Sequence, residues 1–319
     1  MTFETETVLD RRRLRRRLSL WRGLAVLAAL LAFGLVVFAS AEGVGITERR
    51  QIARVSIEGL ITEDRDKLKL LKRLSESKQV AAVILFINSP GGTTTGGEAL
   101  FEAIRELAKA KPVVAQMGTV ATSAAYIAGL ATDHMVARGN TITGSVGVIF
   151  QWAEVTELLH TLGIKVEEVK SGPLKAVPSP FEPIDEKARE ITEEMVQDAK
   201  GWFVDLVGKR RDIEPTSVPG LTDGRIYSGR QAVELKLADE IGDEKTAMSW
   251  LTKERNVPSG LKIVDWKPAA ESSGLFGWLF QSLAASIGLS AEKITGLASQ
   301  ISATLKLDGL VSVWHPASD

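Results

Sequence analysis

The sequence predicts an α/β protein with a mainly parallel sheet, preceded by one membrane-spanning helix. Two observations lead to this fold class. Between residues 51 and 265, short apolar segments of strand character alternate with amphipathic helical segments, which is the pattern of consecutive βα units. Before them, a block of arginines directly precedes an uncharged apolar run from Gly23 to Ala41, which is the pattern of a membrane anchor.

Composition excludes several other classes of protein. The 319 residues are 45% hydrophobic and 25% charged, as in a globular protein rather than a disordered one. The chain has no cysteine, which excludes disulfides, thiolate zinc sites, iron–sulfur clusters and a cysteine nucleophile. Only three histidines are present, and we predict no metal and no cofactor. Beyond residue 22 the acids outnumber the bases by 37 to 32, so we predict no nucleic-acid partner.

The first 50 residues are expected to form three parts. Residues 1–22 are a basic cytoplasmic segment with seven arginines and three acids. Residues 23–41 are the anchor, because a helix of this length spans about 28 Å at ~1.5 Å per residue, close to the roughly 30 Å of a hydrocarbon core. Residues 42–50 are a polar linker. The arginines keep the N-terminal end of this helix in the cytoplasm, so the residues after the helix are exported. The alternative is a signal peptide that is cleaved after Ala39-Ser40-Ala41.

The body, residues 51–265, alternates strands and helices in chain order. The expected strands are Ile52–Ile57, Ala81–Ile87, Val113–Met117, Met135–Ala137 and Lys165–Lys170. The expected helices are Asp66–Ser77, Gly97–Ala110, Ser123–Leu130, Val155–Leu162, Asp185–Arg211, Ser228–Leu235 and Thr246–Lys253. The second strand is a continuous apolar run, as expected for a strand buried on both faces. Residues 266–319 differ in composition and are expected to form a helical C-terminal appendage.

Three segments of small residues follow strands. Gly91 and Gly92 allow backbone amides to face a ligand, as an oxyanion hole requires; the alternative is a plain βα turn. Ser123 lies at a strand-to-helix junction among small residues, where it is either a presented nucleophile or a helix N-cap. Thr143–Gly147 has the small residues needed for close backbone approach beneath such a site.

A serine nucleophile needs a base, and the residues alone leave its identity open. None of the histidines has a loop context that marks it as this base: His134, His160 and His315. Lysine is then the residue type that remains to act as the general base, provided that burial lowers its pKa towards neutrality. Spacing does not choose among the lysines of the region: Lys165, Lys170, Lys175 and Lys187.

Five motifs, in this order and spacing, resemble the short bacterial signal peptide peptidases, the Ser–Lys family also called protease IV. They are INSPGG (87–92), ATSAAY (121–126), TGSVGV (143–148), SGPLKAVPSPF (171–181) and TDGRIYSGRQA (222–232). The resemblance covers residues 50–255 and implies a Clp protease/crotonase-like spiral of βα units. It implies Ser123 as nucleophile, Lys175 as general base and Ser145 as the residue that positions the lysine. The amides of Gly92 and Ser123 would form the oxyanion hole, with Gly91 as a further candidate.

The expectation is therefore a membrane-anchored serine endopeptidase that degrades cleaved signal peptides and other short or unfolded apolar peptides. It would act at the exported face of the bacterial inner membrane, held in the bilayer by residues 23–41, as a homo-oligomeric ring whose neighbouring subunits share the dyad. The alternatives are an inactive exported scaffold of the same fold and an acyl-CoA hydratase-like enzyme. One departure concerns specificity: Ala124 and Ala125 stand where the family commonly has two glycines, and their methyl groups narrow the pocket.

Overall fold

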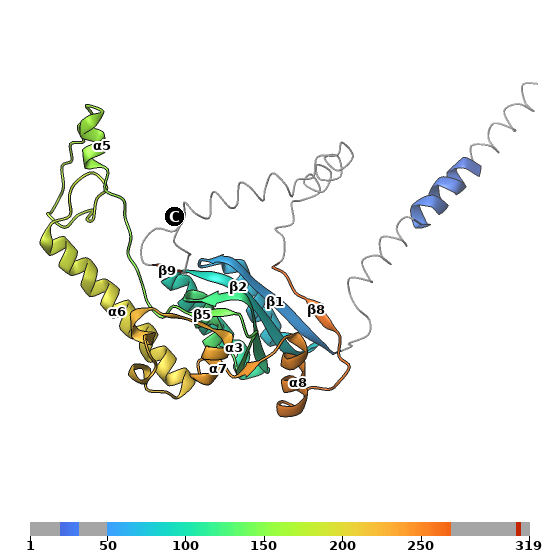
Figure 1. Ribbon diagram of the computed structural model, residues 1–319. Helices are drawn as coiled ribbons and strands as arrows, with labels where there is room; N and C mark the ends of the chain where they lie inside the picture. The colour runs from blue at the N-terminus through green and yellow to red at the C-terminus, as the bar shows by residue number, and fades with distance from the viewer. Residues whose placement is uncertain (1–19, 32–49, 269–310, 314–319) are drawn as a thin grey trace, which may run out of the picture. The chain divides into compact units, whose positions relative to one another are not determined.

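The structure, a computed structural model, describes residues 20–31, 50–268 and 311–313 (Figure 1). The chain divides into two units, Met1–Arg49 and Arg50–Asp319. In the first unit residues 20–31 are helical, and the remainder of the expected anchor lies outside the described residues. Within the described ranges, no helix is both long enough and apolar enough to cross a membrane.

The second unit is built on a mixed, mainly parallel sheet of nine described strands. The strands are β1 (Gln51–Ile61), β2 (Val80–Thr93), β3 (Val113–Thr122), β4 (His134–Ala137), β5 (Ile142–Gly144), β6 (Ile226–Ser228), β7 (Glu240–Ile241), β8 (Ile263–Asp265) and β9 (Val311–Val313). The main path runs β6-β5-β3-β2-β1-β8. All neighbours pair in parallel except β5 with β6 and β2 with β9. The predicted α/β class with a mainly parallel sheet is confirmed.

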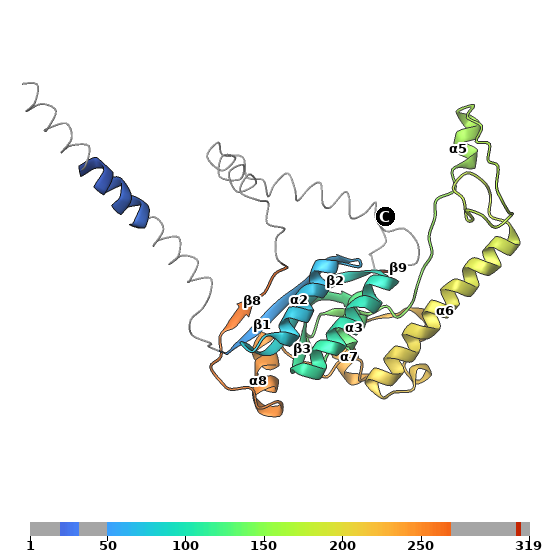
Figure 2. The ribbon, with the colours of Figure 1, turned by 180° about the vertical axis from the view of Figure 1, so that it is seen from behind.

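Helices cover the two faces of this sheet unequally. The described helices of the second unit are α2 (Arg65–Glu76), α3 (Thr94–Ala110), α4 (Ala124–Leu130), α5 (Thr156–Thr161), α6 (Glu186–Arg211), α7 (Gly229–Glu234) and α8 (Glu244–Glu254). Figure 2 shows α2 and α3 lying across one face. Side chains alternate along a strand, so Val55 and Ile57 of β1 join the core beneath these helices, whereas Ile52 packs with Leu251 of α8 on the other face.

Short polar residues begin the helices at the carboxyl ends of the strands. The Asp64 carboxylate accepts the amides of Asp66 and Lys67 at the start of α2, and the Thr93 hydroxyl accepts that of Gly96 at the start of α3. These side chains satisfy amides that a helix leaves without an internal partner. The strand-to-helix turns are thereby fixed at the carboxyl ends of the strands, which is the end of the sheet where Ser123 lies.

Three expectations are corrected. Residues 165–170 form no strand, because they lie in a segment away from the sheet, where no neighbouring strand pairs with them. The INSPGG segment is not a turn after a strand but part of β2, since β1 extends alongside it and pairs Leu60 with Gly91. In the C-terminal appendage, Val311–Val313 form a strand and not a helix, because the exposed edge of β2 offers them backbone partners.

Residues 149–185 form an arm that leaves the sheet after β5 and returns through α6. Figures 1 and 2 both show its outer part, with α5, beyond the N-terminal end of α6. Its exposed large apolar residues are Ile149, Leu158, Leu162, Ile164, Val166, Val169, Leu174 and Phe181. Clustered apolar side chains in water are typical of an interaction surface.

Candidate active site

Ser123 stands in an unusual backbone conformation at the junction of β3 and α4. Its φ is +60° and its ψ is −122°, a region that costs a non-glycine residue about 1–3 kcal/mol. Ser123 is buried, with 1% of its surface exposed, and its side chain makes no N-cap hydrogen bond to α4. The helix-cap interpretation of Ser123 therefore fails. Strain of this kind persists where the surrounding structure enforces it, and it is typical of functional sites.

Neighbouring strands enforce the conformation of Ser123. The Thr122 hydroxyl donates to the Pro90 carbonyl at 3.0 Å, and the Thr143 hydroxyl donates to the Ala121 carbonyl at 2.7 Å. The Ser123 amide donates to the Gly144 carbonyl at 2.8 Å. Both sides of the end of β3 are thus fixed by β2 and β5, so the chain must turn sharply at Ser123 to enter α4.

Small residues permit the close approach of the neighbouring strands around Ser123. At Gly144, where φ is +86°, a Cβ would lie 2.6 Å from the Tyr227 ring. At Gly92, a Cβ would lie 1.8 Å from the carbonyl oxygen of Ile61, so only glycine fits beside β1.

Two of the three amides expected to form the oxyanion hole, those of Ser123 and Gly91, have hydrogen-bond partners within the chain. The Ser123 amide is bonded to Gly144, and the Gly91 amide donates to the Ser89 hydroxyl at 3.1 Å. Gly92 lies within β2, paired with Ile61 on one side. A hole that uses the Ser123 amide therefore requires the Gly144 carbonyl to move away, and the participation of Gly92 stays a prediction.

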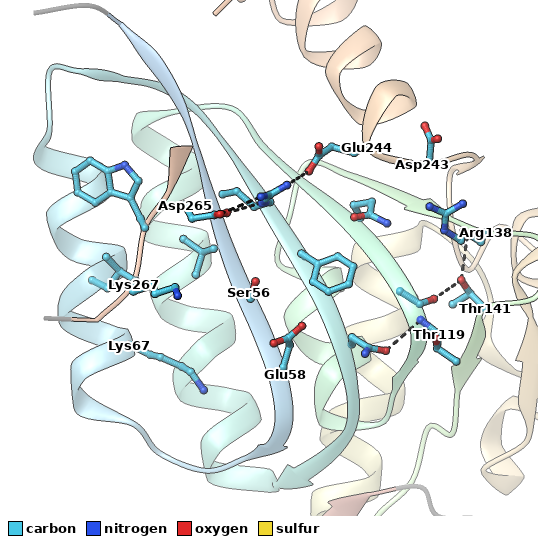
Figure 3. A pocket seen from close by; sticks show the side chains of 18 of the residues that line it. Ser56, Glu58, Lys67, Thr119, Arg138, Thr141, Asp243, Glu244, Asp265 and Lys267 are labelled. Atoms are coloured by element: carbon cyan, nitrogen blue, oxygen red, sulfur yellow. Dashed lines mark hydrogen bonds and ion pairs between the residues drawn. The ribbon is translucent and has the colours of Figure 1, made fainter. Parts of the chain in front are cut away.

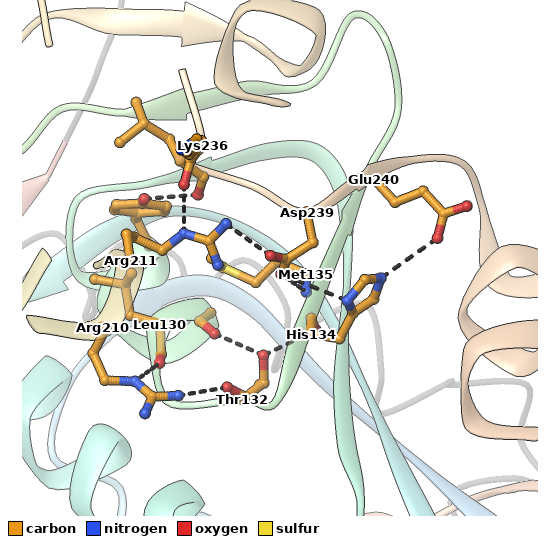
Figure 4. Close-up of polar contacts among 12 residues, drawn as sticks. Leu130, Thr132, His134, Met135, Arg210, Arg211, Lys236, Asp239 and Glu240 are labelled. Carbon is orange, nitrogen blue, oxygen red and sulfur yellow. Dashed lines mark hydrogen bonds and ion pairs between the residues drawn. The ribbon is translucent and has the colours of Figure 1, made fainter. Parts of the chain in front are cut away.

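Arg210 at the end of α6 holds the far end of α4, and Arg211 beside it binds Asp239 (Figure 4). Arg210 donates from Nε to the Leu130 carbonyl at 2.7 Å and from Nη2 to the Thr132 carbonyl at 2.8 Å. Arg211 donates from Nη2 to Asp239 at 2.7 Å, and the other oxygen of that carboxylate accepts the Met135 amide. The Arg210 bonds satisfy the carbonyl of Leu130, which α4 leaves without a helical partner, and that of Thr132 just after the helix, whereas the Arg211–Asp239 pair holds the start of β4.

Tyr126, in the first turn of α4, fixes the helix that follows Ser123. The ring is fully buried, and its hydroxyl donates to the Leu237 carbonyl at 2.8 Å. Burial raises the pKa of Tyr126 above its ordinary value, so the phenol keeps its proton and remains a donor. The sequence analysis did not identify the arginines; the run Lys209-Arg210-Arg211 at the end of a long helix was the available signal.

Lys175 is not brought to Ser123 in a single chain, whereas Ser145 directly follows Gly144, whose carbonyl accepts the Ser123 amide. Lys175 is exposed in the arm, where its amide donates to the Gly172 carbonyl at 3.1 Å. Ser145 follows β5 with φ +54° and donates its amide to Arg225. A cavity of about 380 Å³ beside it is lined by Lys200 of α6 but not by Lys175. Figure 1 shows the outer arm separated from the β3–α4 region by the length of α6.

The remaining candidate bases have other roles in the described chain. His134 stacks on Trp250 with ring centroids 4.7 Å apart and lies 3.4 Å from a Glu240 oxygen, as a structural histidine would; Figure 4 shows its ring directed at Asp239 and Glu240. Lys170 is paired with Glu168 and Glu182. The hydrogen bond from Glu182 raises the pKa of Lys170, which is the opposite of what a general base requires.

A larger cavity lies on the sheet face that α2 and α3 do not cover, and extends to the edge at β8 (Figure 3). Its volume is about 1000 Å³, and Ser123 does not line it. At its edge Arg54 binds Asp265 at 2.5 Å and Glu244 at 2.8 Å. These pairs join β8 and α8 to β1, which is a structural role. Within the described ranges, no cluster of histidine and acidic side chains is placed to hold a metal.

The fold and the Ser123 junction define a Clp protease-like α/β protein. A profile of the Clp protease family matches residues 53–141, which include β1 to β4 and Ser123. A profile of peptidase family S49 matches residues 105–258.

Relatives from three organisms extend this match. One from Synechocystis sp., named "Putative protease", is 33% identical over 204 residues, which are 63% of this chain and 73% of the relative. One of the same name from Methanocaldococcus jannaschii is 35% identical over 66% of this chain and 67% of its own. A "Putative signal peptide peptidase SppA" of Enterococcus faecium is 32% identical over 76% of this chain and 74% of its own. The chain belongs to peptidase family S49, the family of SppA.

The attachment of α4 to α6 is testable by removing one arginine. In Arg210→Ala, the charged hydrogen bonds to the Leu130 and Thr132 carbonyls, at and just after the end of α4, are lost, and we expect the free energy of unfolding to fall by about 2–4 kcal/mol. Lys209→Ala is the matched control, because it removes the same charge from an exposed neighbouring position and should change stability by less than about 0.5 kcal/mol. Chemical denaturation measures both variants; equal stabilities would contradict the role given to Arg210.

Proposed function

We propose that this peptidase is a serine endopeptidase that uses a Ser123–Lys175 dyad. The observation that carries the proposal is the strained, buried Ser123 at the start of α4. Strand-to-helix junctions of this type present a nucleophilic hydroxyl to substrate. Family membership supports the peptidase activity, and Lys175 lies in the motif that resembles the family's lysine loop.

The chemistry follows from these two side chains. Neutral Lys175 Nζ accepts the Ser123 proton while Oγ attacks the carbonyl carbon of the scissile peptide. The tetrahedral intermediate collapses, the amine leaves with the proton from Lys175, and the acyl group remains on Ser123. Lysine then takes a proton from water, which hydrolyses the ester and restores the serine. Ser145 positions the lysine amine, and the Gly92 amide, joined by that of Ser123 once it leaves the Gly144 carbonyl, stabilises the oxyanion.

The dyad is proposed to form between subunits of a homo-oligomeric ring. Two observations support this arrangement: the arm carries Lys175 on an exposed surface, and several large apolar residues of the arm are exposed in the described chain. A head-to-tail contact would bury these residues and deliver Lys175 to the neighbour's Ser123. Burial at this contact would disfavour the ammonium, lowering the lysine pKa as a base requires.

The pH dependence tests the base. Activity should rise with pH as Lys175 loses its proton, because an ammonium cannot accept the serine proton. Lys175→Arg should lose at least about 10³-fold in kcat/KM, since guanidinium stays protonated. Lys165→Arg, a control in the same arm, should retain activity and the same pH profile. A peptidase assay across pH measures this; a Lys175→Arg enzyme close to wild type would remove Lys175 from the mechanism.

Complementation tests the sharing of the site. Ser123→Ala and Lys175→Ala should each be inactive, but oligomers formed by refolding the two together should contain interfaces with an intact Ser123 facing an intact Lys175. We expect activity to return in the mixture and not in either variant alone. Mixed oligomers, verified by differently tagged chains, that stay inactive would show that the dyad forms within one chain.

The proposed location is the exported face of the bacterial inner membrane, with residues 23–41 as anchor and the N-terminus in the cytoplasm. The proposed substrates are cleaved signal peptides and other short or unfolded apolar peptides; the name of the enterococcal relative supports this class. Protein extracted from membranes should keep Met1 to Ala41. An N-terminus at Glu42, found by sequencing the mature protein, would identify a cleaved signal instead.

A further inference from the structure

A cavity of about 380 Å³ lies between the end of β5 and α6. Its walls come from residues 145–149 after β5, from α6, and from the turn at residues 222–224. Among the described side chains that line it, only Lys200 of α6 and Asp223 of the turn are ionisable. The mechanism proposed above uses neither of them.

The wall that Ser145 contributes to this cavity adjoins the nucleophile. Ser145 follows Gly144, whose carbonyl accepts the Ser123 amide at 2.8 Å. The position of Ser145 is fixed, because its own amide donates to the Arg225 carbonyl at 2.9 Å. In the proposed mechanism the amine of Lys175 from the neighbouring subunit lies against Ser145. That amine therefore approaches this cavity.

Lys200 brings an unpaired positive charge to the cavity. The residue is half-buried, and its ammonium forms no hydrogen bond or ion pair within the described ranges. The side chains one turn away from it along α6 are uncharged. The wall after β5 carries no ionisable side chain, and the turn at residues 222–224 carries the exposed Asp223. An amine that arrives at Ser145 would thus meet a cation that one exposed carboxylate offsets only in part.

A cation makes protonation of a second amine beside it less favourable, because the two positive charges repel. For charges about 6 Å apart, the repulsion lowers the proton affinity of the amine about threefold in a water-like medium and about a hundredfold at an effective dielectric constant of about 20. An adjacent cationic group is a general means of activating a lysine. Of two neighbouring lysines, the more deeply buried loses its proton first, and the subunit contact would enclose Lys175 more than Lys200.

We propose that the Lys200 ammonium holds Lys175 of the neighbouring subunit in its neutral, proton-accepting form. Lys200 touches no reacting atom and acts through Lys175, so it is a positioning residue. Asp223 opposes it, because a carboxylate favours the protonated amine. The proposal rests on the proposed function, which brings Lys175 to Ser145.

The protonation of Lys175 is measurable in oligomers of Ser123→Ala protein, where nothing depends on turnover. Acetic anhydride acetylates only neutral amines, so the acetylation of Lys175 across pH, quantified by mass spectrometry, gives the midpoint of its titration. Lys200→Gln removes the neighbouring charge, whereas Lys200→Arg keeps it. Lys209→Gln is the matched control, because it removes the same charge from an exposed position at the far end of α6. The same substitutions in active enzyme are compared by the pH profile of kcat/KM.

We expect Lys200→Gln to raise both midpoints by about one pH unit, with about tenfold less activity below the midpoint, and Asp223→Asn to lower them. Lys200→Arg and Lys209→Gln should keep the wild-type midpoints. Unchanged midpoints in Lys200→Gln would overturn the proposal, and so would activity that falls equally at every pH, as a merely structural role would give. Failure of the proposed function would appear separately, as a Lys175→Arg enzyme close to wild type.

Discussion

The left-handed backbone of Ser123 is the constraint on which the rest of the site depends. A residue at φ +60° after a parallel strand reverses the chain abruptly, so α4 begins at once and runs back over the sheet. The conformation is costly and persists because strands on both sides fix the end of β3, while Tyr126 and Arg210 hold α4 at its two ends. Most of the surrounding polar contacts thus maintain one strained residue.

Gly92 allows β1 and β2 to stay paired beyond the end of β3. Because a side chain there would meet the Ile61 carbonyl, β1 and β2 stay paired past the point where β3 departs. This leaves an edge of β2 beside Ser123 with strand-pairing groups available, and β9 pairs there.

Long periodic elements and several short ones, such as Met135–Ala137 in β4, were predictable from the sequence, whereas features that depend on contacts between distant parts of the chain were not. The helix expected at Asp185–Arg211 is α6, and the apolar run Ala81–Ile87 is the centre of β2. Residues 165–170 contain two β-branched valines but form no strand, because a strand needs a neighbour and the arm provides none. Ser123 and Lys175 came from motifs; the capping role of Arg210 did not, because it depends on a contact between residues 80 positions apart. The hydrogen bond from the Ser123 amide to the Gly144 carbonyl could not be predicted either, since it depends on the position of β5.

The central claim is that Lys175 of one subunit meets the site of its neighbour. The chain has no cysteine, so Ser145→Cys/Lys175→Cys protein carries only two thiols, and Ser145→Cys/Lys165→Cys is a matched control from the same arm. After mild oxidation, denaturing electrophoresis without reductant shows which chains are joined. The account predicts covalent dimers and higher ladders for the Lys175 variant and far fewer for the control. Cross-linked protein that migrates only as a monomer, with its two thiols joined within one chain, would contradict it.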